Sequence, residues 1–89
     1  MNKNFLRIPL HKLYYIDNVS DFSGFTKKDI ESLKSEYDES ELIGIVESVR
    51  WATQNQNYDF SSLLPNLKHS NDEIFQYLCK LDVSLNPNN

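Results

Sequence analysis

Cysteine, glycine and proline are scarce in this chain of 89 residues, which contains one, two and three of them respectively. A single cysteine, Cys79, excludes an intrachain disulfide and a metal site built from several thiolates. The two glycines, Gly24 and Gly44, are isolated, so the sequence has no glycine-rich loop to hold a phosphate. So few glycines and prolines also disfavour a turn-rich sandwich or barrel. The length predicts a single domain over residues 1–89.

Clusters of positive charge and long apolar runs are also missing. Nine Lys and Arg residues stand against 13 Asp and Glu, and the longest basic cluster is Lys27-Lys28. Nucleic-acid binding needs a positive surface that displaces counterions from phosphate, so no nucleic-acid partner is expected. No run approaches the roughly 18 apolar residues of a membrane span, and residues 1–12 lack the pattern of a secretory signal. We therefore expect a cytoplasmic protein without membrane association, whose net charge of -4 favours a basic partner.

Motifs for catalysis or metal binding are absent from the sequence. His11 and His69 belong to no H-x-x-x-H or H-x-x-E-H pattern, and the chain has no G-x-S-x-G. Cys79 lies among apolar residues, where a small buried side chain is expected rather than a reactive thiol. The sequence thus predicts a protein that is not an enzyme and holds no metal or cofactor.

Helix starts are marked clearly at three places between residues 26 and 73. Three pairs have the spacing of a capping box: Thr26 with Asp29, Asp38 with Glu41, and Ser70 with Glu73. Apolar residues then recur at helical spacing, most regularly at Leu42, Ile45, Val46, Val49 and Ala52, and again at Ile74, Leu78, Leu81 and Leu85. These patterns predict an all-α bundle with helices over residues 9–17, 26–37, 39–55 and 71–85, and a short helical turn over 59–64.

The third predicted helix, residues 39–55, has two further features. Ile43 and Trp51 lie off its apolar stripe, which predicts burial on more than one side. Gly44 and Ser48 are four residues apart and form a lane of small side chains where another helix can approach closely. A glycine inside a helix costs about 1 kcal/mol relative to alanine, so we expect a packing gain that offsets this cost.

The first 22 residues allow two interpretations. Leu6 to Leu10 alternate like a strand, whereas Pro9 followed by Leu10, Leu13 and Tyr14 is typical of a helix that starts at proline. We favour the helix, because a lone strand would be an exposed edge in so small a protein. The alternative is an α+β fold with a short N-terminal strand. The polar residues 86–89 are expected to form a disordered tail.

Four carboxylates, Glu36, Asp38, Glu39 and Glu41, form what we call the acidic corner. Dense like charges are normally tolerated because they face water or lie at the positive end of a helix. Alternatively, they form an electrostatic docking patch for a basic protein. Capping accounts for Asp38 and Glu41, so Glu36 and Glu39 carry the stronger expectation of binding.

Aromatic residues supply a second set of candidate partner-binding residues. Tyr14 and Tyr15 are adjacent, so a helix cannot turn both inward, and Tyr15 is a candidate surface anchor. Tyr58 lies at a loop-to-helix junction and is predicted to be exposed, while Tyr37 lies within the acidic corner. Tyrosine beside carboxylates is typical of a binding hot spot surrounded by charge.

The run Asp38–Glu41 (DESE) beside tyrosines, in a short acidic helical chain, resembles the bacterial immunity proteins. These are small cytosolic antidotes to bacteriocins and other polymorphic toxins, many of which are basic nucleases. The resemblance implies binding to a cognate toxin and inhibition by covering its active or substrate-binding surface. Charge would speed the encounter and aromatic anchors would slow release.

Two other functions fit the helical pattern. One is a helical adaptor that acts as a homodimer through the Gly44–Ser48 lane. The other is a helix-turn-helix DNA-binding protein with its turn near Tyr37. Its second helix would carry three glutamates against Arg50, which is the wrong sign for a recognition helix, so this function ranks last.

Overall fold

Helices dominate the computed structural model, which describes residues 3–85. A broken helical run, the N-terminal segment, consists of η1 (Lys3–Leu6), α1 (Arg7–Leu10) and η2 (His11–Tyr15). The longer helices are α2 (Lys27–Glu36), α3 (Glu39–Thr53) and α4 (Asn71–Leu85), and η3 (Val19–Asp21) and η4 (Phe60–Leu63) are short 3-10 turns. No strand occurs in residues 3–85, so the predicted all-α fold is confirmed. The predicted tail, residues 86–89, lies outside the described residues.

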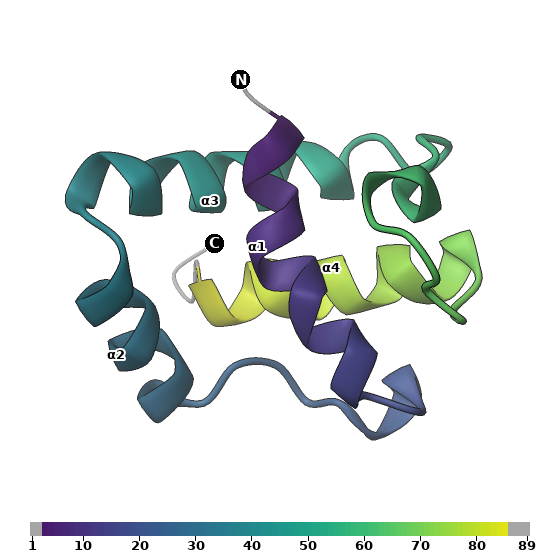
Figure 1. The fold of residues 1–89 in the computed structure, drawn as a ribbon, viewed down its shortest axis with the longest axis horizontal. Helices are drawn as coiled ribbons and strands as arrows, with labels where there is room; N and C mark the ends of the chain where they lie inside the picture. The colour runs from purple at the N-terminus through teal and green to yellow at the C-terminus, as the bar shows by residue number, and fades with distance from the viewer. Residues whose placement is uncertain (1–2, 86–89) are drawn as a thin grey trace.

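Helices α3 and α4 lie side by side with opposite directions, and the N-terminal segment crosses both of them (Figure 1). Helix α2 lies to the left of the N-terminal segment in Figure 1, near the start of α3 and the end of α4. The core of the described chain comprises these buried side chains: Leu6, Leu10, Leu13, Val19, Phe25, Ile45, Val49, Ala52, Phe60, Leu64, Ile74, Tyr77, Leu78 and Leu81. The bundle therefore has a two-helix base with one covering segment.

The predicted boundaries of the three later helices agree with the structure to within two residues. The N-terminal helix is present as well, but its bounds differ from the predicted 9–17, since the described helical run spans Lys3–Tyr15. The alternative of a strand over residues 6–10 is wrong. Leu6, Leu10 and Leu13 are spaced by four and three residues and are all fully buried, so a helical face buries them together. The strand-like alternation of residues 6–10 follows from this helical spacing, because Leu6 and Leu10 lie one helical turn apart.

Pro9 lies inside the helical run and explains why this run is irregular. Proline has no N–H to donate to the preceding turn, so a regular α-helix cannot pass through this position without losing a hydrogen bond. The run changes instead between 3-10 and α geometry. The Pro9 carbonyl accepts a hydrogen bond from the buried Tyr77 hydroxyl at 2.6 Å, which ties the segment to α4. Burial raises the pKa of Tyr77, so the phenol remains a donor.

The lane of small residues on α3 is occupied within the chain. A Cβ built on Gly44 would lie 2.6 Å from a ring carbon of Phe5, so only glycine lets η1 pack this closely on α3. Ser48, one turn later, is fully buried, and its hydroxyl donates to the Ile45 carbonyl. The close helix contact predicted for this lane is thus made by the N-terminal segment. The Phe5 ring thus covers part of the lane on which the homodimer interface was predicted.

The three predicted capping boxes are present with both hydrogen bonds each. Thr26 Oγ1 accepts from Asp29 N at 3.2 Å and the Asp29 carboxylate accepts from Thr26 N at 2.9 Å. The Ser70 and Glu73 pair repeats this arrangement at 3.1 and 3.2 Å at the start of α4. These bonds satisfy N–H groups that the first turn of a helix leaves without a partner. The Asp38 and Glu41 pair is described with the acidic corner below.

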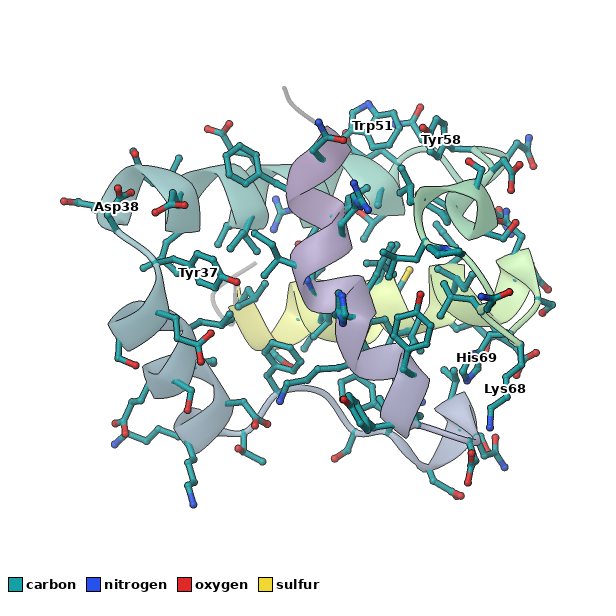
Figure 2. All side chains as sticks on the ribbon, in the orientation of Figure 1. Tyr37, Asp38, Trp51, Tyr58, Lys68 and His69 are labelled. Atoms are coloured by element: carbon teal, nitrogen blue, oxygen red, sulfur yellow. The ribbon has the colours of Figure 1, made fainter. Side chains whose placement is uncertain are left out.

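Three contacts with the loop before α4 fix the C-terminal end of the N-terminal segment. The Tyr14 hydroxyl donates to the Pro65 carbonyl at 2.6 Å, and Lys68 pairs with Asp17. His69 is almost fully buried, and its Nε2 lies 2.6 Å from the Ile16 carbonyl (lower right in Figure 2). The carbonyl accepts, so Nε2 carries the proton. These three contacts hold the loop before α4 against the end of η2.

Replacement of Gly44 tests the packing of the N-terminal segment on α3. Gly44→Ala should destabilise the protein by about 1–3 kcal/mol, because the added methyl overlaps the Phe5 ring. In a Phe5→Ala background the same change should stabilise it by about 1 kcal/mol, because alanine is the better helix former. Urea unfolding of the four proteins measures both effects, and a neutral or stabilising Gly44→Ala in the natural background would contradict this packing.

Candidate functional site

The acidic corner forms where α2 ends and α3 begins (left in Figure 2). Asp38 Oδ1 accepts hydrogen bonds from Glu41 N at 2.8 Å and Ser40 Oγ at 2.9 Å, and Glu41 Oε1 accepts from Asp38 N at 3.2 Å. The backbone N–H of Glu41 is the main cause that holds the pKa of Asp38 below its usual value of 3.8. These two carboxylates are therefore engaged in the capping box, as predicted.

The other two members of the corner are free of such structural bonds. Glu36 and Glu39 are exposed, and neither forms an ion pair with any residue between 3 and 85. Their negative charges are consequently available to a partner at little desolvation cost.

The exposed side of α3 extends the corner along the helix. Glu39, Ile43 and Glu47 follow one another at intervals of four residues, and we call this row the outer face of α3. Ile43 is 52% exposed, and Glu47 is exposed without an ion pair in the described chain. Arg50, the nearest cation along the helix, is committed to Asp82 at 3.1 Å on α4. The exposed isoleucine and the uncompensated carboxylates on either side of it thus form a continuous row.

Ile43 and Glu47 were not among the predicted partner-binding residues. The prediction that Ile43 is buried on a second side of α3 is wrong, because the N-terminal segment and α4 cover only the stripe around Ile45 and Val49. The sequence does contain an indication of these two residues. The spacing of Glu39, Ile43 and Glu47 places an isoleucine from outside the apolar stripe on the same helix face as two acids.

The three candidate tyrosines lie in different environments. Tyr15 is 88% exposed at the end of η2, as predicted for a surface anchor. Tyr58 was predicted to be exposed, and this is wrong. It is half-buried, with ring centroids 5.1 Å from Trp51 and 5.3 Å from Phe60 (upper right in Figure 2). Tyr37 is half-buried and packs against the core beside the acidic corner.

Tyr15 and Tyr37 each border a surface hollow. A hollow of about 450 Å³ is lined by Lys12, Tyr15, Ile16 and Phe22. Another of about 440 Å³ lies over the outward side of the N-terminal segment and is lined by Asn4, Arg7, Ile8, His11, Tyr37 and Leu64. The structure therefore does not gather the seven predicted residues into one site. Tyr37 lies with the acidic corner and Tyr58 lies far from it (Figure 2), while Tyr15 lies at the end of η2.

Groups with catalytic or metal-binding chemistry are not clustered in the described structure. Residues 3–85 contain no group of three or more His, Cys, Asp or Glu side chains placed to hold a metal ion. Cys79 is half-buried, and burial, followed by the charge of Asp82, raises the pKa of its thiol, which lowers its reactivity. Among the helices described, none is long and apolar enough to cross a bilayer.

Comparison of the chain with protein-family models, with curated proteins and with solved structures gave no match.

Acid should unfold this protein partly through its capping carboxylates. The pKa values of Asp29, Asp38 and Glu73 are lowered in the folded state, mainly by hydrogen bonds from backbone N–H groups, and that of Asp17 is lowered by Lys68. Because the folded-state pKa is the lower one, the stabilisation is present above the usual values of 3.8 and 4.5 and is lost as the pH falls through the folded-state values.

Asp38→Asn isolates one of these contributions. Asparagine is an equally good N-cap but does not ionise, so the variant should lose less stability than the natural protein between about pH 6 and about pH 2.5. Urea midpoints at the two pH values give the measurement. An identical loss in both proteins would show that Asp38 is not bound to the helix start in its charged form.

Proposed function

We propose that this chain is a non-enzymatic protein-binding module, and specifically an immunity protein that binds and neutralises a basic, nuclease-type bacterial toxin in the cytoplasm. The observation that supports this proposal most strongly is the outer face of α3, where exposed Ile43 lies between the uncompensated carboxylates of Glu39 and Glu47.

The chemistry of this face suits a basic protein surface. A positively charged partner gains from Glu39 and Glu47 during the encounter, because exposed charges of opposite sign raise the association rate. Ile43 then supplies an apolar contact that is buried only in the complex, and apolar burial contributes about 25 cal/mol per Å². Glu36, at the end of α2, extends the negative surface beyond the start of α3.

Rigidity of the face is a further point in its favour. Helix α3 is fixed by its capping box, by the Gly44–Phe5 contact and by the Arg50–Asp82 ion pair. Such a helix presents these side chains without a backbone ordering cost on binding, which favours tight association. Covering the toxin's catalytic or substrate-binding surface would then be sufficient for inhibition, with no chemical step on this chain.

The location of the gene gives a first test. The gene of an immunity protein should lie directly downstream of a gene for a large secreted toxin, and the toxin domain supplies the binding partner for the measurements below. An unrelated neighbourhood would remove the immunity function while leaving the binding face to be tested separately.

Charge reversal on the outer face tests the binding mode. Glu39→Lys combined with Glu47→Lys should lower the association rate with the toxin domain about tenfold or more at low ionic strength, and less at high salt. The matched control is Asp21→Lys with Asp72→Lys, which changes the net charge equally at exposed positions on other elements. Ile43→Ala should instead mainly raise the dissociation rate.

Stopped-flow or surface-based kinetics at two salt concentrations separates these effects. If both double variants slow association equally, only the net charge matters and the outer face is not the binding surface. If neither has an effect, the carboxylates are ordinary solvated side chains.

Self-association through α3 is disfavoured by the same charges. Two copies paired on this face would bring Glu39 and Glu47 of each copy towards those of the other, and the Gly44–Ser48 lane is already covered in part by Phe5. We expect a monomer of 10.4 kDa by light scattering at micromolar concentration. A dimer that is lost on Ile43→Lys would support the homodimeric adaptor instead.

A further inference from the structure

An aliphatic groove lies between α2, the start of α3 and the end of α4. Its volume is about 300 Å³, and it is lined by Ile30, Leu33, Lys34, Leu42, Val46, Ser84 and Leu85. The figures show the three helices around it: α2 and the beginning of α3 on one side, and the yellow end of α4 on the other (Figure 1). The groove borders the outer face of α3, since Val46 lies three residues after Ile43, but Glu39, Ile43 and Glu47 are not among its lining residues.

Packing leaves this groove open. Its aliphatic side chains from α2 and α3, such as Ile30, Leu33 and Leu42, are only half-buried, and α2 has no fully buried residue. Closer packing of α2 against α3 and α4 would cover these aliphatic side chains, so in the present arrangement they remain accessible in the groove. A hydrogen bond just before α2 connects its start to α4: Phe25 N donates to Ser84 Oγ at 3.0 Å, directly after Gly24 with its φ of 106°.

The polar groups of the groove define the other part of its chemistry. Ser84 Oγ accepts from Phe25 N and donates to the Lys80 carbonyl, so its hydrogen-bonding capacity is used within the fold. Lys34 is exposed, and its ammonium group has no ion-pair or hydrogen-bond partner within residues 3–85. The groove thus combines an aliphatic lining with one uncompensated cation at its rim.

We propose that this groove binds a medium-length aliphatic chain that ends in a carboxylate, with the chain against Leu33, Leu42 and Val46 and the carboxylate beside Lys34. The volume lies at the small end of the roughly 300–1,000 Å³ typical of small-molecule sites, which suits one short chain. An anionic headgroup is the complement of Lys34.

Decanoate below its micelle concentration is a suitable probe. Titration of the isotope-labelled protein should show saturable one-to-one binding, with shifts centred on residues 30–34, 42–46 and 84–85. Uncharged 1-decanol should bind at least about threefold more weakly, because it lacks the interaction with the ammonium group. Lys34→Gln should remove this difference, while Lys28→Gln, an exposed position on the same helix outside the groove, should preserve it.

Filling the groove tests the position of the chain. Val46→Phe should abolish decanoate binding, and Val83→Phe, at a 70% exposed position outside the groove lining, should not. If Val46→Phe does not fold, Leu85→Asn at the end of α4 gives the same test through a tenfold or greater loss of affinity.

Three results would overturn the proposal: no saturable binding, equal binding of decanoate and decanol by the natural protein, or binding that survives both groove variants. Dimerisation driven by the groove and lost in Val46→Phe would also overturn it, since the groove would then accept a second copy.

Discussion

The burial of one leucine face of the N-terminal segment is the constraint on which the remaining structure depends. Helices α3 and α4 form an antiparallel pair whose shared apolar side would be exposed without Leu6, Leu10 and Leu13. The segment contains Pro9 and cannot form a regular helix, so its stability comes from packing rather than from its own hydrogen bonds. Two specific contacts fix its position on the pair: Gly44 admits Phe5, and Tyr77 donates to the Pro9 carbonyl.

This packing determines which surfaces are left for a partner. The N-terminal segment uses the Gly44 side of α3, and α4 uses the side around Val49, so the row of Glu39, Ile43 and Glu47 stays in solvent. The charge at this row is uncompensated because Arg50 is committed to α4. Fold and proposed function are therefore connected: the same contacts that complete the core make α3 rigid and leave its acidic face free.

Much of the fold was predictable because it is encoded locally. Capping boxes at Thr26, Asp38 and Ser70 set the three helix starts, and helical periodicity set their buried faces. The N-terminal segment was harder, since Leu6 fits both a strand and a helix until α3 and α4 are present to bury it. The site was predicted only in part. Spacing places Glu39 on an exposed face, but the sequence cannot show that Ile43 remains uncovered, because this depends on where distant elements pack.

Carboxyl footprinting of the protein, alone and bound to the basic partner that the proposed function requires, tests the central claim most directly. The claim is that the fold leaves the outer face of α3 as the surface for a basic partner. The account predicts that Glu39 and Glu47 lose reactivity in the complex, while Asp21 and Asp72, exposed on other elements, keep theirs. Unchanged reactivity of Glu39 and Glu47 in a stable complex, with protection elsewhere, would contradict it.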